Sequence, residues 1–90
     1  MSLAGYNIEY KMKARVYVTM KPSVLDAQGQ AVRSALQSMG HSMVQDVRQG
    51  KYFEIELAEL DRAKAEAAVK AMCDKLIANT VIENYVIELA

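Results

Sequence analysis

The amino-acid sequence predicts an α+β domain in which two helices cover one face of a four-stranded antiparallel sheet. Apolar residues recur every three or four positions in two segments, as in amphipathic helices, and at every second position in others, as in strands. The 90 residues suffice for one domain, so residues 1–90 are expected to share one core. The only cysteine, Cys73, excludes an internal disulfide, and packing must therefore hold the fold.

The first part of the chain predicts a strand and then a helix. Residues Lys13–Met20 alternate between apolar and other side chains, and Pro22 ends the strand because proline cannot donate to a sheet ladder. Asp26 suits the N-cap of a helix that extends to Met39, since its carboxylate accepts free amides of the first turn. Gly40 suits the left-handed end of that helix.

The remaining segments predict a hairpin, a second helix and a last strand. Val44–Arg48 forms a weak strand and Tyr52–Leu57 a strong one, with a turn near Gln49-Gly50. An alanine-rich helix starts at the N-cap Asp61, and Val81–Leu89 is the final strand. The order strand, helix, strand, strand, helix, strand is that of the ferredoxin-like split βαβ sandwich (βαββαβ).

Residues 1–11 are expected to form an N-terminal extension, and its first three residues resemble a tag remnant. No apolar run approaches the roughly 18–20 residues of a membrane helix, so we expect no membrane contact. The single cysteine suits a reducing compartment, so we expect a cytoplasmic protein. The 11 basic residues balance the 11 acidic ones. The chain lacks the basic excess of a nucleic-acid binder, and its neutrality permits close association between copies.

The sheet face opposite the helices predicts a contact with other copies, as a homodimer or homotetramer. Tyrosine is enriched at interfaces because its ring is apolar and its hydroxyl is polar. A solvated face is the alternative. The residues expected on this face are Arg15, Tyr17, Thr19, Tyr52, Glu54 and Glu56.

No catalytic residue, metal ligand set or phosphate-binding glycine loop is predicted. His41 is the only histidine and lies beyond the first helix, while Cys73 belongs to the apolar stripe of the second. Residues Arg48–Lys51 combine two cations with a glycine, which suits a solvated turn, a partner contact or an anion site. Tyr17 and Tyr52 lack the surrounding motif of an RNA-binding sheet.

Several segments, spaced over nearly the whole chain, resemble PurS, the small subunit of phosphoribosylformylglycinamidine (FGAM) synthase. These segments are Ala14–Pro22, Val24–Gly29, Val47–Tyr52, Met72–Asn79 and Val81–Tyr85. The chain departs from the family at Ala27 and Thr80, where proline is common, and at Ser23, where glycine is common. These differences concern loop conformation.

The resemblance implies a role in a ligase complex of purine biosynthesis. A PurL-type synthetase subunit uses ATP and Mg²⁺, and a PurQ-type glutaminase subunit releases ammonia from glutamine. The PurS-like subunit bridges them and supports ammonia transfer, with neither catalytic residues nor a cofactor of its own. Residues expected at partner surfaces are Lys21, Arg48, Gly50, Lys51 and Asn79.

Two other functions stay open on sequence grounds. Ferredoxin-like dimers can bind small molecules between their subunits, so a sensor domain is one alternative. A stand-alone enzyme of the same fold is the other, and the absence of a paired acid, base or nucleophile argues against it.

Overall fold

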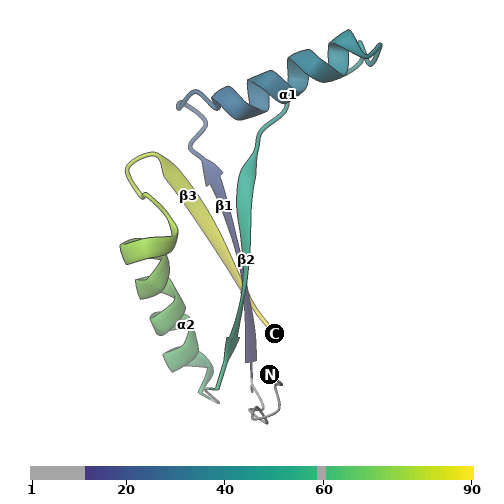
Figure 1. Cartoon of the computed structure of the whole chain (residues 1–90). Helices are drawn as coiled ribbons and strands as arrows, with labels where there is room; N and C mark the ends of the chain where they lie inside the picture. Colours follow the sequence, from purple (N-terminus) through teal and green to yellow (C-terminus); the bar gives the residue numbers. More distant parts are fainter. Residues whose placement is uncertain (1–11, 59–60) are drawn as a thin grey trace, which may run out of the picture.

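The computed structural model describes residues 12–58 and 61–90; the predicted extension, residues 1–11, lies outside them. The described residues form three strands and two main helices, whose arrangement can be followed in Figure 1. Along the chain these are β1 (Met12–Met20), α1 (Ala27–Ser38), β2 (Gly50–Leu57), α2 (Arg62–Met72) with a π-helical turn η2 (Cys73–Ile77), and β3 (Glu83–Leu89). The predicted α+β class is confirmed, and within the described residues no helix is long and apolar enough to cross a membrane.

The sheet has β1 at its centre. β1 pairs antiparallel with both β2 and β3, in the order β2-β1-β3. Val16, for example, lies opposite Phe53 on one side and Ile87 on the other. Because side chains alternate along a strand, this register puts the apolar residues of all three strands on one face, which we call the core face.

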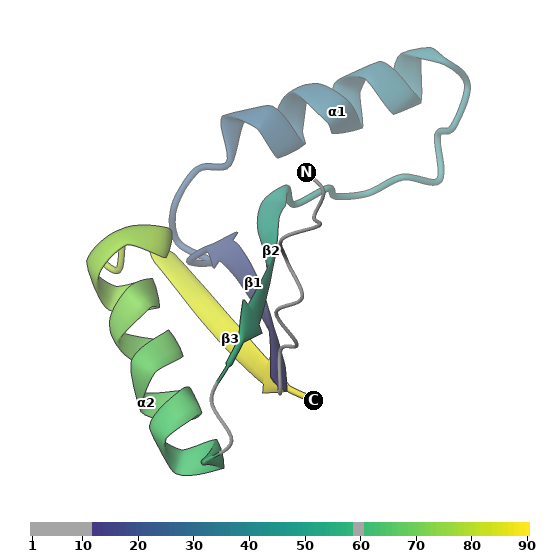
Figure 2. The same cartoon turned by 60° about the horizontal axis from the view of Figure 1, so that its bottom comes forward.

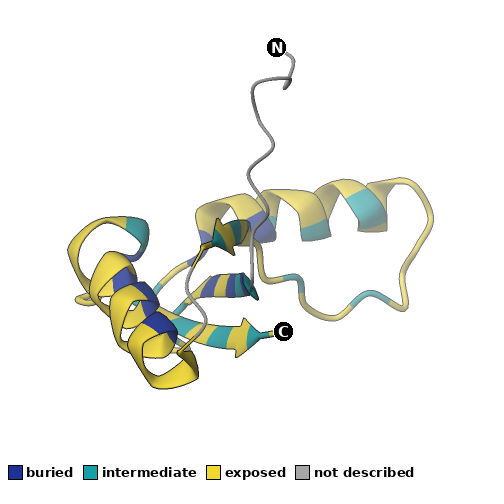
Figure 3. Cartoon of the chain, turned by 90° about the horizontal axis from the view of Figure 1, so that it is seen from below, coloured by how far each residue is buried: buried dark blue, intermediate teal, exposed yellow. Residues whose placement is uncertain are grey.

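The core lies between β1 and α2 (Figure 3). Asp61 starts α2 as predicted, since its Oδ1 accepts the amides of Ala63 and Lys64 at 2.9 and 3.1 Å. The buried side of α2 then meets the core face of β1. The side chains enclosed there are Ala14, Val16 and Val18 from β1 and Ala65, Val69 and Cys73 from α2 and η2.

The predicted fourth strand is not found, so the described residues form three strands rather than four. Val44–Arg48 follows α1 back toward the sheet without joining it. Gln37 Nε2 donates to the carbonyl of Val44 at 2.7 Å, and the carbonyl of Val47 lies against Gly29. The segment has apolar residues at Val44 and Val47, three apart, and therefore lacks the alternation that holds a strand in register.

The prediction that both helices cover one sheet face is also wrong for a single copy. Asp26 caps α1 and Gly40, at φ +100°, follows its end as expected, but α1 points away from the sheet (Figures 1 and 2). Only α2 lies over the core face, so Phe53, Ile55 and Leu57 of β2 are merely half-buried. We call α1 and its return segment, residues 27–49, the arm.

Replacing Val69 by alanine tests whether the contact between β1 and α2 is the main core. Val69 is fully buried, so we expect a loss of about 2 kcal/mol in the free energy of unfolding. Val81→Ala is the control, because Val81 is 78% exposed and should lose less than about 0.5 kcal/mol. Urea unfolding at one fixed protein concentration measures both, and equal losses would contradict this assignment of the core.

Candidate functional site

The antiparallel sheet brings separate loops together at one end, where β1 ends and β2 and β3 begin. We call it the loop end. The amide of Lys21, just after β1, donates to the carbonyl of Ile82, just before β3, at 2.9 Å. All five residues predicted at partner surfaces lie at or beside this end: Lys21, Arg48, Gly50, Lys51 and Asn79.

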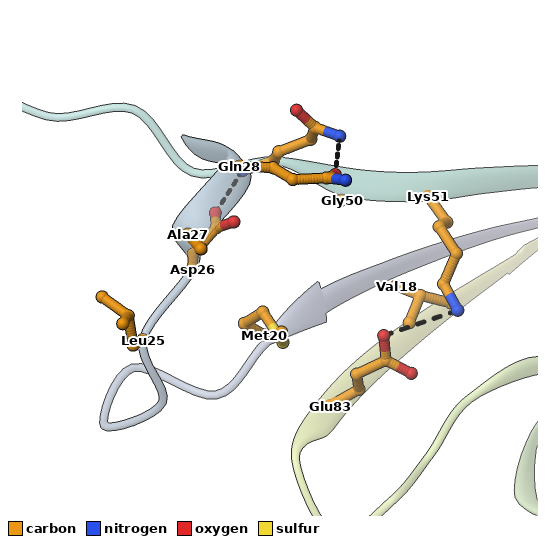
Figure 4. A pocket seen from close by; sticks show the side chains of 10 residues that line it. Val18, Met20, Leu25, Asp26, Ala27, Gln28, Gly50, Lys51 and Glu83 are labelled. Atoms are coloured by element: carbon orange, nitrogen blue, oxygen red, sulfur yellow. Dashed lines mark hydrogen bonds and ion pairs between the residues drawn. The ribbon is translucent and has the colours of Figure 1, made fainter. Parts of the chain in front are cut away.

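A pocket of about 370 Å³ opens at the loop end (Figure 4). Its floor is apolar, with Val18 and Met20 from β1 and Leu25 from the next loop. Polar side chains from the start of α1, from β2 and from β3 surround it. They are Asp26, Gln28, Gln49, Lys51 and Glu83.

Lys51 reaches across the central strand. It lies opposite Val18 on the core face, and its Nζ is 3.4 Å from Glu83 Oε2 and 3.4 Å from the carbonyl of Ile77. The Lys51 side chain is half-exposed, so the ion pair adds little stability. Lys51 thus links β2 to β3 while keeping its ammonium group accessible at the surface.

The Arg48 side chain bonds to backbone carbonyls of its own chain. Its Nη2 lies 3.1 Å from the carbonyl of Lys21 and 3.4 Å from the carbonyls of Met20 and Val24. The guanidinium therefore fastens the loop between β1 and α1 to the segment that enters β2. A contact between Arg48 and another subunit stays a prediction, and it would have to spare or replace these bonds.

Asp26 has a second role that the sequence does not reveal. One carboxylate oxygen caps α1 by accepting the amide of Gly29 at 3.0 Å, and the other accepts the amide of Gln49 at 2.6 Å. The side chain is only 4% exposed. The bonds from the Gln49 and Gly29 amides, with some help from the Arg48 charge, hold the pKa of this carboxyl below its ordinary 3.8.

Glycine and asparagine shape the same end of the sheet. A Cβ on Gly29 would collide with the Asp26 carboxylate and the Val47 carbonyl, and a Cβ on Gly50 would collide with the Val18 carbonyl. Asn79 Oδ1 accepts the amide of Val81 at 3.2 Å, which closes the turn before β3. The sequence marked Gly29 only as a weak helix former, because the close approach depends on residues far along the chain.

The predicted oligomer face is the side of the sheet opposite α2. The rings of Tyr17 and Tyr52 lie 5.1 Å apart, and their hydroxyls donate to Glu88 at 3.1 Å and Glu54 at 2.7 Å. These bonds to carboxylates are the main cause that raises the pKa of both tyrosines, so both remain neutral phenols. The register confirms that the six predicted residues share this face, while their contact with another copy stays a prediction.

Cys73 and His41, the two residues considered as candidates for chemistry, lie in different surroundings from each other. Cys73 is fully buried, and this burial is the main cause that raises the pKa of its thiol, so it remains a core residue. His41 lies exposed beyond α1. In residues 12–58 and 61–90 no three His, Cys, Asp or Glu side chains gather as a metal site would require.

The pH dependence of unfolding tests the environment of Asp26. A carboxyl whose folded pKa is lowered stabilises the fold above its unfolded pKa, near 3.8, and this contribution is lost as the pH falls through the folded pKa. Urea midpoints measured from about pH 6 to about pH 3 should therefore fall more steeply for the parent than for Asp26→Asn. Asp46→Asn, on an exposed residue of the return segment, should keep the parent's slope; a parallel curve for Asp26→Asn would contradict the assignment.

Known proteins are similar to this chain in both sequence and fold. A family model described as PurS, phosphoribosylformylglycinamidine (FGAM) synthase, matches residues 13–90. The chain is 56% identical over 73 residues to the FGAM synthase subunit PurS of Bacillus subtilis, which is 81% of this chain and 86% of that protein. The structure of B. subtilis PurS has a TM-score of 0.81 at 53% identity and covers 88% of this chain and 98% of its own.

A chain in the structure of PurLQS from Thermotoga maritima also matches, with a TM-score of 0.80 and 26% identity over 88% of this chain and 96% of its own. These matches confirm the resemblance seen in the sequence. The family model matches all of the described fold except Met12, the first residue of β1. The chain belongs to the PurS family of FGAM synthase subunits.

Proposed function

We propose that this chain is the non-catalytic assembly subunit of FGAM synthase, which joins a PurL-type synthetase to a PurQ-type glutaminase and supports ammonia transfer in the cytoplasm. One observation carries the proposal: the described chain matches, over nearly its whole fold, a chain in the structure of PurLQS. ATP and Mg²⁺ would be used by the synthetase subunit, so this chain would contribute surfaces rather than chemistry.

The loop end is the surface that we assign to the partner subunits. Its loops are fastened by side-chain bonds from Asp26, Arg48 and Asn79, so they form a preorganised surface. Binding through preorganised loops costs less conformational entropy than binding through mobile ones. Lys21 adds positive charge to this surface, which would favour an acidic patch on a partner, whereas the charge of Lys51 is paired with Glu83.

A homodimer would complete the ferredoxin-like plan that a single copy lacks. Within the described residues, the outer edge of β2 pairs with no strand, and the core face beside β2 is half-covered. The arm of the same chain carries the unused helix and the segment Val44–Arg48, the two elements that the plan would put there. The arm of a second copy is therefore the occupant whose shape and chemistry fit the gap.

Exposed apolar residues on the arm support this exchange. Val32 is 40% exposed, Met39 69% and Met43 73%. Large exposed apolar side chains along one segment can mark a surface that another protein covers. The outer sheet face around Tyr17 and Tyr52 offers a second contact, by which two dimers would form the homotetramer.

Reconstitution tests the assembly role. Adding the chain to purified synthetase and glutaminase should restore FGAM synthesis with glutamine and leave synthesis with free ammonia unchanged. Lys21→Glu at the loop end should lower the glutamine-dependent rate about three- to tenfold, because it reverses a charge that faces a partner. Lys64→Glu makes the same change at the start of α2, toward the other end of the sheet, and should have no effect. An equal glutamine-dependent rate without the chain would refute the proposal.

Sedimentation equilibrium tests the exchange of arms. Val32→Glu buries a charge in the proposed contact and should raise the dimer dissociation constant about tenfold or more. Ser34→Glu adds the same charge two residues along α1, about 200° around the helix, and should change the constant less than about twofold. Equal effects of the two variants would exclude α1 as the contact.

A further inference from the structure

We infer that Asp26 and Arg48 form a latch that fixes the direction in which the arm leaves the sheet and so prepares the arm to bind a second copy. The fixed direction is a property of one copy. Its effect on self-association rests on the proposed exchange of arms.

Two connections tie the arm to the sheet: residues 21–26 lead from β1 into α1 (the incoming connection), and residues 48–49 lead from the return segment into β2 (the outgoing connection). The latch consists of hydrogen bonds that each connection makes to the other. On the incoming connection, the Asp26 carboxylate accepts the amide of Gln49, which lies on the outgoing one. On the outgoing connection, the Arg48 guanidinium donates to the carbonyls of Lys21 and Val24, which lie on the incoming one. These bonds link residues 23 to 27 positions apart in sequence, so they do not form as part of α1 itself.

The latch is tightly fitted at Asp26. The carboxylate is nearly inaccessible and uses both oxygens, one for Gly29 and one for Gln49. Losing it would leave two amides in need of other partners, which is costly for buried groups. Gly29 permits the fit, since a Cβ there would strike both the Asp26 carboxylate and the Val47 carbonyl.

The arm needs such a device because α1 does not rest on its own sheet (Figure 2). A helix that packs on a sheet is oriented by its buried face, as α2 is by Ala65 and Val69. The orientation of α1 has to come from its base. An arm held in the direction it uses when bound loses less entropy on association, so the latch should strengthen self-association without touching the second copy.

Asp61 provides a matched control. It also caps a helix by accepting two backbone amides, those of Ala63 and Lys64, but its helix lies against the sheet. If Asp26 were only a helix cap, Asp26→Asn and Asp61→Asn would have similar effects on self-association. If Asp26 is a latch, their effects differ.

The experiment compares the two variants by sedimentation equilibrium and by amide hydrogen exchange in the full chain. Asp26→Asn should raise the dimer dissociation constant about tenfold and speed exchange at Gln49 and along α1, whereas Asp61→Asn should change the constant less than about twofold. Arg48→Met leaves the helix cap in place and should reproduce the effect of Asp26→Asn, which keeps the test decisive if that variant folds poorly.

Equal dissociation constants for the Asp26 and Asp61 variants, or unchanged exchange at Gln49, would overturn the latch. A parent chain that remains monomeric would contradict the exchange of arms instead. In that case hydrogen exchange decides alone: faster exchange in Asp26→Asn and Arg48→Met, absent from Asp61→Asn, supports the latch, and unchanged exchange in all three overturns it.

Discussion

A three-stranded sheet presents a wider apolar face than one helix can cover, and the rest of this structure depends on that mismatch. α2 encloses the part of the core face formed by β1, where Val16 and Val69 are fully buried. The part formed by β2 keeps Phe53 and Ile55 half-exposed. Half-exposed apolar residues on a sheet whose second helix points elsewhere favour association, because burying them stabilises the fold.

The same mismatch links stability to assembly. A domain of this length buries only about 60–70% of the surface of its unfolded chain, so its stability is marginal when alone. A contact that covers β2 and the arm would add to the free energy of unfolding in proportion to the logarithm of the protein concentration. Folding and association are then two parts of one equilibrium, which is a natural property for a subunit that works inside a complex.

The charged residues of the loop end hold its loops in place. Asp26 and Arg48 bond to backbone groups of neighbouring segments, and Lys51 bonds to the carbonyl of Ile77 and pairs with Glu83 of β3. Ordered loops at one end of a sheet can bind other proteins, and this agrees with membership of a family of enzyme-complex subunits.

The sequence by itself determined the local elements and the family. The alternation of apolar residues located β1 and β2, and the caps Asp26 and Asp61 located the starts of both helices. Short segments along the chain identified the PurS family. These signals are local, because each depends on residues within one strand or one helical turn. Val44–Arg48 is the one segment whose predicted strand is absent, because its weak pattern of apolar residues is compatible with a strand and with a return loop equally.

Only the tertiary structure decided where α1 goes. The stripe of apolar residues on α1 predicts that the helix is covered, but a stripe does not specify which surface covers it, nor whether that surface belongs to the same chain. The second bond of Asp26, to Gln49, and the close approach at Gly29 were hidden for the same reason. They depend on how two connections separated by a whole helix meet in space, and periodicity within a segment carries no information about that.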